Sequence, residues 1–311
     1  MIHVENLTKY YHDFCAVDNF NLDVHKGEVL GMLGPNGAGK TTFMRMLTGF
    51  LKPSEGTIRV KELSMESDAL DVKKLMGYLP ESAPLYKDML AYDYLLYVAG
   101  IRGIRDEKIA ARIRYLSDLC GLNNMIHKPI GELSKGYKQR VGLAHAMMGD
   151  PEILILDEPT SGLDPNQIVE IRDIIRQIGK EKTVILSTHI LSEAEATCDR
   201  VVIVHKGKIA ADDRTENLKV ASDQENHLNL SIHNADPEAV RTLLEGVEGV
   251  QQVNMTDAAE NALSIKLSCE SGRDVRGPVY LAIKDTDWVL TELTLETQTL
   301  ESIFRQITLE S

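Results

Sequence analysis

The segment Gly34–Thr42 reads Gly-Pro-Asn-Gly-Ala-Gly-Lys-Thr-Thr, and it lies between an apolar run that ends at Leu33 and a helix-like stretch that stops at Gly49. This is the Gly-x4-Gly-Lys-Thr spacing of a P-loop, in the strand–loop–helix context that the motif requires. Glycines let consecutive backbone N–H groups turn towards an anion, and the helix behind the loop adds the positive end of its dipole. The segment therefore predicts a phosphate-binding loop. An ordinary glycine-rich turn before a helix is the weaker alternative.

The residue types in this loop predict how it would bind a nucleotide. We expect Lys40 to place a cation on the β- and γ-phosphates of ATP and so to take part in catalysis. We expect Thr41 to offer its hydroxyl to Mg²⁺. The residues predicted to contact the nucleotide are Gly34, Pro35, Asn36, Gly37, Ala38, Gly39, Lys40, Thr41 and Thr42.

Two adjacent carboxylates follow a second apolar run. Ile153–Leu156 is short and wholly apolar, which is typical of a buried parallel strand, and Asp157 and Glu158 come directly after it. In open α/β sheets, ligands gather beyond the carboxyl ends of such strands. We expect Asp157 to hold Mg²⁺, directly or through water, and Glu158 to orient or deprotonate an attacking water. An exposed acidic pair that starts a turn is the alternative.

A predicted helix beginning after Ser134 offers a second anion site. Ser134 is a good N-cap, and its hydroxyl, the N–H of Gly136 and the helix N-terminus could together bind a phosphate. A serine cap alone more often does no more than cap its helix. The position of this helix shortly before the Asp157-Glu158 strand favours the functional interpretation.

The order of predicted elements indicates a first domain at residues 1–220. Short strands fill residues 1–33, residues 90–148 read as mainly helical, and strands alternate with helices from residue 152. Alternation of this kind around a P-loop predicts an α/β fold with a mostly parallel sheet that is covered on both faces.

The polar stretch 205–226 indicates a domain boundary near residue 220. Residues 221–311 then follow a βαββαβ order, which predicts a small α+β, ferredoxin-like accessory domain. A closing amphipathic helix is predicted at 300–307, either packed on the core or in contact with a partner.

Composition limits the possible functions. The formal net charge is −13, and the acidic excess lies mostly beyond residue 220, which argues against broad nucleic-acid binding. The four cysteines are far apart without Cys-x-x-Cys spacing, so we expect free thiols in a reducing compartment. We see neither a secretory signal nor an apolar run of about 18 residues, so any membrane association should run through a partner.

Residues 1–220 resemble the ATP-binding subunit of ABC (ATP-binding cassette) transporters. The resemblance is carried by a Walker A-like P-loop, a Walker B-like strand with Asp157-Glu158, a signature-like Leu133–Tyr137, a D-loop-like Ser161–Asp164 and a switch-like His189. It implies an ABC ATPase of the P-loop NTPase class. The implied fold has a RecA-like parallel sheet, an N-terminal antiparallel β subdomain and a helical subdomain at about 90–148.

The resemblance also implies further site residues. His189 would hold the γ-phosphate and act in catalysis, and Tyr11 would stack on adenine, with Tyr10 as the neighbouring candidate. Ser134, Gly136 and Asp164 would contact nucleotide. Glu81 stands where the family usually has Gln and would still face the metal. The signature reads Ser-Lys-Gly-Tyr in place of Ser-Gly-Gly-Gln, so Tyr137 stands where the family usually has Gln.

As the resemblance implies, two cassettes, identical or different, would close head to tail on ATP. They would serve separate transmembrane permease subunits at the cytoplasmic face of the inner membrane. The variant signature and the appended domain are similar to ABC-2 type exporters, including drug-export and gliding-motility systems. We expect Pro84–Tyr97 to touch the permease; internal packing is the alternative.

Two other classes of function are weaker. A soluble ABC protein acting on ribosomes or DNA would need a second cassette or an inserted coiled coil, and the sequence shows neither. A P-loop GTPase would normally carry an Asn-Lys-x-Asp base-reading motif, which we do not find, and a kinase has no use for a signature motif.

Overall fold

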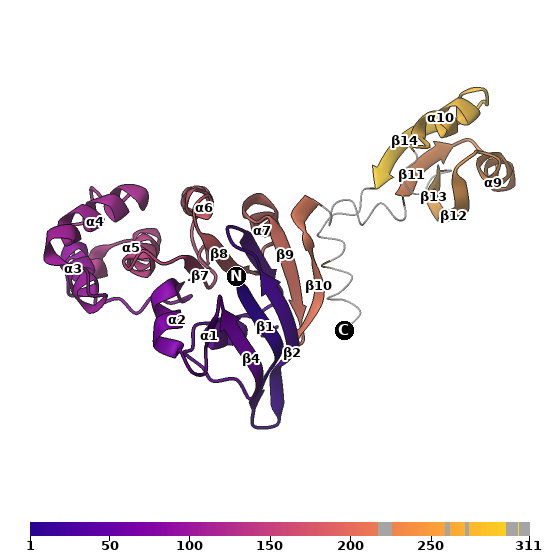
Figure 1. Cartoon of the computed structure of the whole chain (residues 1–311). Helices are drawn as coiled ribbons and strands as arrows, with labels where there is room; N and C mark the ends of the chain where they lie inside the picture. Colours follow the sequence, from indigo (N-terminus) through magenta and orange to yellow (C-terminus); the bar gives the residue numbers. More distant parts are fainter. Residues whose placement is uncertain (217–225, 259–261, 271–273, 297–303, 305–311) are drawn as a thin grey trace. The chain divides into compact units, whose positions relative to one another are not determined.

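The computed structural model describes residues 1–216, 226–258, 262–270, 274–296 and 304. These fall into two compact units, Met1–Thr215 and Glu216–Ser311 (Figure 1). The predicted closing helix at 300–307 lies outside the described residues except for Phe304. In the part of the chain that the structure describes, no helix is both long and apolar enough to cross a bilayer.

An antiparallel sheet forms the N-terminal part of the first unit. Its strands run in the order β2-β1-β4-β5. Buried and exposed side chains alternate along much of β2, so that one face of the strand points into the core. The bounds are β1 (Ile2–Tyr11), β2 (Phe14–Val24), β4 (Glu55–Val60) and β5 (Leu63–Ser64).

A six-stranded sheet organises the rest of this unit, in the order β10-β9-β3-β8-β7-β6. The pairs from β9 to β6 are parallel, and β10 pairs antiparallel with β9. Every residue of β3 and β7 is buried, as expected for parallel strands covered on both faces. The bounds are β3 (Val29–Leu33), β6 (Met76–Leu79), β7 (Ile153–Leu156), β8 (Thr183–Thr188), β9 (Arg200–His205) and β10 (Lys208–Arg214).

The core of the first unit joins both sheets to helix α1 (Lys40–Leu47). Phe20 of β2 and Phe43 of α1 are fully buried, with ring centroids 5.4 Å apart. Apolar residues of β3 and β7 complete the same cluster. Burial of these large side chains holds α1, and therefore the loop before it, against the parallel sheet.

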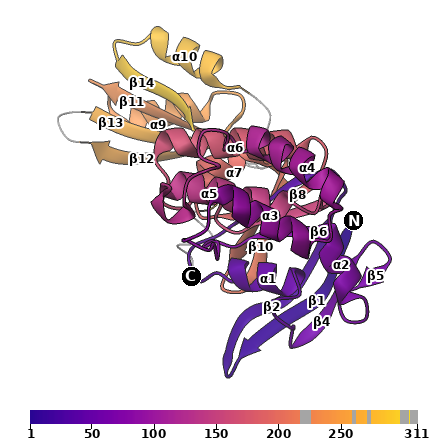
Figure 2. The same cartoon turned by 90° about the vertical axis from the view of Figure 1, so that its left-hand side faces the viewer.

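Three of the remaining helices of the first unit form a lobe. Helices α3, α4 and α5 gather in a lobe to one side of the sheets in Figure 1 and lie in front in Figure 2, and the 3-10 turn η1 (Ile130–Glu132) precedes α5. All three helices lie within the predicted helical region 90–148. The bounds are α2 (Ala69–Leu75), α3 (Ala91–Ile101), α4 (Asp106–Leu119), α5 (Lys135–Met147), α6 (Pro165–Gly179) and α7 (Leu191–Thr197).

The second unit has the predicted βαββαβ order. Its sheet runs β12-β13-β11-β14, and each pair is antiparallel. Leu230, Val240, Ile265 and Val279 are among the buried residues of its own core. The bounds are β11 (Asn226–His233), α9 (Pro237–Glu245), β12 (Val250–Ala258), β13 (Ala262–Cys269), α10 (Arg276–Lys284) and β14 (Val289–Glu296).

The predicted α/β class with a parallel sheet and an antiparallel β subdomain is confirmed. One element differs, because Lys208–Arg214 was taken as part of a polar boundary and instead forms strand β10. All four cysteines are free thiols, as predicted.

Candidate nucleotide-binding site

The carboxyl ends of four neighbouring parallel strands meet at one edge of the six-stranded sheet. The P-loop follows β3, His189 follows β8, Asp157 follows β7, and Glu81 lies two residues beyond β6. Because β3, β8, β7 and β6 are neighbours in that order, segments far apart in the sequence reach the same edge.

A cavity of about 420 Å³ opens at this edge. It brings together most of the sequence-predicted site residues from the P-loop, the hairpin between β1 and β2, and the ends of β6, β7 and β8. Its lining residues are Tyr11, Phe14, Ala16, Asn36, Gly37, Ala38, Gly39, Lys40, Thr41, Thr42, Glu81, Glu158, Ser161 and His189.

The conformation of the P-loop depends on glycine. Gly37 and Gly39 have φ angles of 81° and 109°, in the region that disfavours other residues. A Cβ atom at Gly39 would lie 2.5 Å from the carbonyl oxygen of Ala16. The loop can therefore curl against the β2 strand only with glycine at this position.

Lys40 is 5% exposed and lies folded into the loop. Its ammonium donates to the carbonyl oxygens of Gly34 (2.6 Å) and Pro35 (3.2 Å), and lies 3.4 Å from Glu158 Oε1. Gly34 and Pro35 do not line the cavity, but their carbonyls position the cation. A cation and a carboxylate are thus held together at the base of the cavity.

Asp157 is 1% exposed, and burial raises the pKa of its carboxyl group, although hydrogen bonds from Ser187 and Thr41 oppose that rise. Its Oδ1 accepts from Ser187 Oγ at 2.7 Å and from Thr41 Oγ1 at 3.1 Å. Its Oδ2 is buried and has no hydrogen-bond partner among the described residues. A buried, unpaired carboxylate oxygen beside a threonine hydroxyl fits a divalent cation.

No group of three or more His, Cys, Asp or Glu side chains in the described ranges could hold a metal ion by itself. Mg²⁺ is usually bound by one or two protein ligands together with substrate phosphates and water.

Glu158 and His189 are in contact. Glu158 Oε2 lies 2.8 Å from His189 Nδ1, and the Glu158 side chain is 10% exposed, whereas that of His189 is 42% exposed. The backbone of Glu158 has a φ of 49°, which is uncommon for a residue with a side chain. Its N–H donates to Ser187 Oγ at 2.9 Å. The carboxylate is therefore fixed from both its backbone and its side chain.

Two aromatic residues stand at the mouth of the cavity. Tyr11 and Phe14 pair across the β1–β2 hairpin, and they are 41% and 63% exposed. Tyr10 pairs with Cys15 and does not line the cavity. The geometry therefore favours Tyr11 over Tyr10 as the partner of a flat ring. It adds Phe14, which the sequence interpretation missed.

Ser134, Gly136 and Asp164 do not line this cavity. Ser134 caps α5, accepting from Tyr137 N at 3.4 Å, and Asp164 caps α6, accepting from Gln167 N at 3.0 Å. The N-cap at Ser134 agrees with the sequence prediction. A Cβ atom at Gly136 would lie 2.6 Å from the end of the Gln167 side chain, so α5 approaches α6 closely at this position.

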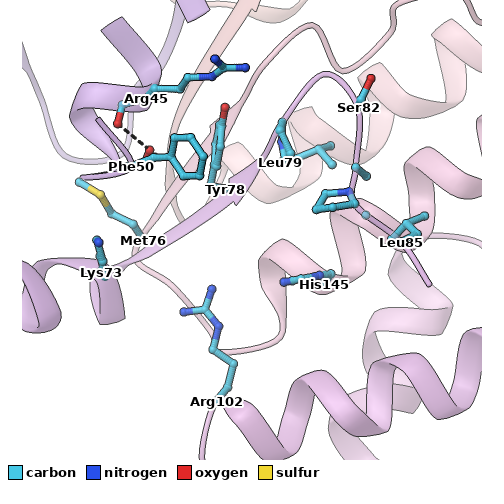
Figure 3. A pocket seen from close by; sticks show the side chains of 15 residues that line it. Arg45, Phe50, Lys73, Met76, Tyr78, Leu79, Ser82, Leu85, Arg102 and His145 are labelled. Carbon is cyan, nitrogen blue, oxygen red and sulfur yellow. Dashed lines mark hydrogen bonds between the residues drawn. The ribbon is translucent and has the colours of Figure 1, made fainter. Parts of the chain in front are cut away.

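A groove of about 660 Å³ lies beside the site, between the end of α1, strand β6 with its following loop, and α5. Its apolar lining includes Phe50, Met76, Tyr78, Leu79 and Leu85. Figure 3 shows three cationic side chains around these residues, from Arg45, Lys73 and Arg102. Among the described residues, none of these cations is paired with a carboxylate.

Two groups that line this groove are held in their neutral forms. Burial raises the pKa of Tyr78 to about 12. Burial lowers the pKa of His145, and the nearby Arg102 lowers it further. The cationic character of the groove therefore comes from its Arg and Lys side chains.

The segment Pro84–Tyr97, expected to touch a partner, divides into inward and outward residues. Tyr94 is 2% exposed, and its hydroxyl lies 2.6 Å from His145 Nδ1, so it belongs to internal packing. Tyr86 and Tyr97 are 54% and 47% exposed, with ring centroids 5.9 Å apart.

Comparison with known proteins places these features in a family. The sequence profile described as ABC transporter matches residues 17–161. An uncharacterised ABC transporter ATP-binding protein, YxlF of Bacillus subtilis, is 40% identical over 232 residues, which cover 75% of this chain and 77% of YxlF.

Two relatives carry transport names. The bacitracin transport ATP-binding protein BcrA of Bacillus licheniformis is 39% identical, covering 70% of this chain and 71% of BcrA. The lantibiotic transport ATP-binding protein SrtF of Streptococcus pyogenes is 38% identical, covering 70% of this chain and 94% of SrtF.

Solved structures share the fold of the first unit. The cbiO1 protein of Clostridium perfringens, part of an ABC transporter complex, matches with a TM-score of 0.64 and 28% identity, covering 70% of this chain and 89% of cbiO1. A dimeric ATP-binding cassette bound to ADP and phosphate matches with a TM-score of 0.64 at 23% identity, covering 69% of this chain and 99% of that one.

Proposed function

We propose that this chain, which belongs to the ABC transporter family of ATP-binding ATPases, powers export through separate membrane-spanning subunits. The observation that carries the proposal is the convergence of Lys40, Glu158 and His189 in one cavity beside Asp157. ATP would bind there, and its hydrolysis would drive the opening and closing of a paired cassette.

In this proposal each polar group has a separate task. Lys40 would exchange its contact with Glu158 for the β- and γ-phosphates of ATP, which frees the carboxylate to act on water. Glu158 would orient that water and accept its proton. His189, already 2.8 Å from Glu158, would donate to the γ-phosphate. Tyr11, with Phe14 beside it, would cover the adenine ring.

The donor set suits Mg²⁺ as the metal of this site. Thr41 and Asp157 would hold the ion. Glu81 lines the same cavity and would face the ion. When bound, Mg²⁺ neutralises charge on the phosphates. Ser187 keeps Asp157 oriented for this role through its 2.7 Å hydrogen bond.

The second half of the ATP site would come from another cassette. Ser134 is exposed at the start of α5 and does not reach the cavity of its own chain, while Gly136 leaves the helix N-terminus without a side chain at that position. A helix N-terminus capped by a hydroxyl is suited to a phosphate. We therefore infer that Ser134 and Gly136, with Asp164 nearby on the D-loop, close on ATP held by a second copy or a paired subunit.

The groove beside the site is the proposed docking surface for the membrane partner. Its occupant would be a cytoplasmic segment of the permease with apolar and acidic side chains. Arg45, Lys73 and Arg102 surround an apolar floor, which complements such a segment in charge and hydropathy. The exposed rings of Tyr86 and Tyr97 would extend the same surface.

The names of BcrA and SrtF support a role in transport, and the proposed direction, export, rests on the resemblance of the variant signature and appended domain to ABC-2 type exporters. The membrane partner would be of the ABC-2 type, and the chain would lie peripherally on the cytoplasmic face of the inner membrane. The second candidate, a soluble ABC protein acting on ribosomes or DNA, has no observation in its favour here.

A pair of substitutions tests the catalytic proposal. Glu158→Gln removes the base but keeps the shape of the side chain, so we expect ATP binding to persist and the hydrolysis rate to fall about 100-fold or more. The ATP-bound variant should accumulate as a dimer in light scattering. Lys40→Ala, which removes the cation, should instead lose both hydrolysis and most nucleotide affinity.

Two results would contradict the proposal. Hydrolysis by Glu158→Gln at the wild-type rate would remove Glu158 from the chemistry. An ATP-bound Glu158→Gln variant that stays strictly monomeric at every concentration would remove the paired-cassette mechanism.

A further inference from the structure

A buried carboxylate on α7 joins the two segments that carry Glu158 and His189. Glu193 is 6% exposed, and its Oε2 accepts hydrogen bonds from Thr160 Oγ1 at 2.7 Å and Thr188 Oγ1 at 2.8 Å. Thr160 lies two residues beyond Glu158, and Thr188 directly precedes His189. A single carboxylate oxygen therefore links the turn after β7 to the turn after β8.

The hydrogen bonds through Thr188 have a definite direction. The N–H of Ile190 donates to Thr188 Oγ1 at 3.0 Å, and the same hydroxyl donates to Glu193. The first bond closes the backbone around His189, and the second ties that turn to α7. Glu193 therefore fixes the turn from which the imidazole reaches Glu158.

Ser187 links the same two segments from the other side. Successive strand residues point in opposite directions, so Ser187 and Thr188 face different partners. Ser187 contacts Asp157 and the backbone of Glu158, while Thr188 contacts Glu193. Glu158 keeps its φ of 49°, a strained conformation that persists only where surrounding contacts hold it.

A buried carboxylate at position 193 lowers the stability of the fold. Oε1 of Glu193 is buried and has no hydrogen-bond partner among the described residues. A buried carboxylate with unfilled hydrogen-bonding capacity destabilises a fold. A contact that served only to pack α7 on the sheet would be made at lower cost by an apolar side chain. The arrangement is therefore better explained by a need to hold two hydroxyls at fixed places.

We propose that Glu193 is a positioning residue, which sets the distance between Glu158 and His189 by holding Thr160 and Thr188 on one oxygen. This inference rests on the roles proposed above for Glu158 and His189. Without Glu193 only Ser187 would still tie the two turns together, and the 2.8 Å contact between imidazole and carboxylate would loosen. Lys40 and the P-loop belong to β3 and α1, so ATP binding should be spared.

Three variants of the full-length chain test the inference. Glu193→Met keeps the volume but removes the acceptor, and we expect kcat for ATP hydrolysis to fall about 10- to 100-fold with little change in KM. Glu193→Gln should recover most of kcat, since its amide oxygen can still accept both hydroxyls. Thr197→Val is the matched control: Thr197 is a buried residue of α7 whose hydroxyl has no partner among the described residues, so kcat should be unchanged.

A double-mutant cycle separates positioning from general stability. Thr160→Val and Thr188→Val each remove one donor at constant shape, and each should lower kcat in the wild-type background. In the Glu193→Met background Thr160→Val should not lower it further, because the shared acceptor is already absent. Thr188→Val is left out of this comparison, because it also removes the acceptor of the Ile190 N–H. If Glu193→Met does not fold, the variant with both threonines replaced by Val takes its place and should show the same loss of kcat.

The inference is overturned by any of three results. These are wild-type kcat in Glu193→Met or in the double threonine variant, equal impairment of Glu193→Gln and Glu193→Met, or an effect of Thr160→Val that remains fully additive with Glu193→Met. An active Glu158→Gln variant would instead defeat the proposed role of Glu158. Wild-type kcat in Glu193→Met beside an inactive Glu158→Gln variant would defeat this inference alone.

Discussion

Glu158 illustrates how the surroundings of a residue determine its use. Its left-handed backbone is strained, and it is held by Ser187 at the N–H and by Lys40 and His189 at the carboxylate. These contacts come from the end of β8 and the start of α1, so the orientation of one side chain depends on two other segments of the chain. Preorganised charges of this kind cost no reorganisation at the moment of reaction.

At the residue scale, the base-stacking role can be assigned by experiment. Tyr11→Ala should weaken ATP binding by about 1–3 kcal/mol, the usual value of an aromatic ring stacked on a base. Tyr10→Ala is the matched control and should leave the Kd for ATP unchanged, because Tyr10 does not line the cavity. Isothermal titration of both variants measures the difference, and equal losses of affinity would refute the assignment to Tyr11.

Local motifs made part of the site predictable. Lys40, Thr41, Asp157 and Glu158 follow from short sequence patterns, because the P-loop and the acidic strand end each carry their chemistry within a few residues. Phe14, Ser187 and Glu193 were missed for the opposite reason. Each acquires its meaning only from a contact across the hairpin or the sheet, such as the hydrogen bond from Ser187 to Asp157 across 30 residues.

At the scale of elements, hydrophobic pattern decided what could be predicted. Ile153–Leu156 is both the predicted strand and the observed β7, because a wholly apolar run leaves few alternatives. Strand β10 was missed, since its residues are largely polar and none of them is buried. It lies at the edge of the sheet, where charged residues such as Lys208 and Asp212 are expected and protect against aggregation.

The groove between α1, β6 and α5 supports a prediction at the same scale. Arg102→Glu reverses one of its cations, so we expect the chain to lose its co-purification with the membrane partner from detergent extracts. Lys180→Glu, a charge reversal at the exposed end of α6, is the matched control and should co-purify as the wild type does. Undiminished recovery of the partner with Arg102→Glu would argue against docking in this groove.

At the scale of the whole molecule, the chain consists of two units with separate cores. Every residue assigned to the nucleotide site lies in the first unit, before Thr215. The role of the second unit stays a proposal, an accessory domain whose composition is acidic. A change of composition near residue 220 predicted two domains. The sequence pattern could not predict which side chains pack together inside each of them.

Removal of residues 221–311 tests this partition. The truncated chain should bind ATP with the affinity of the full chain, because its site and the core beneath it are complete. The rise in Tm on adding ATP reports binding to the folded state in both forms. A truncated chain that melts cooperatively but shows no rise in Tm with ATP would disprove the partition.

The central place of β3 has a consequence for biosynthesis. This strand leaves the ribosome early, but its two neighbours in the sheet, Thr183–Thr188 and Arg200–His205, are translated about 150 residues later. At about 5–20 residues per second, the nascent P-loop waits roughly 8–30 s for the strands that support it. Nucleotide therefore cannot assist the early stages of folding on the ribosome, and a polypeptide stalled before β8 would expose an unpaired apolar segment to chaperones.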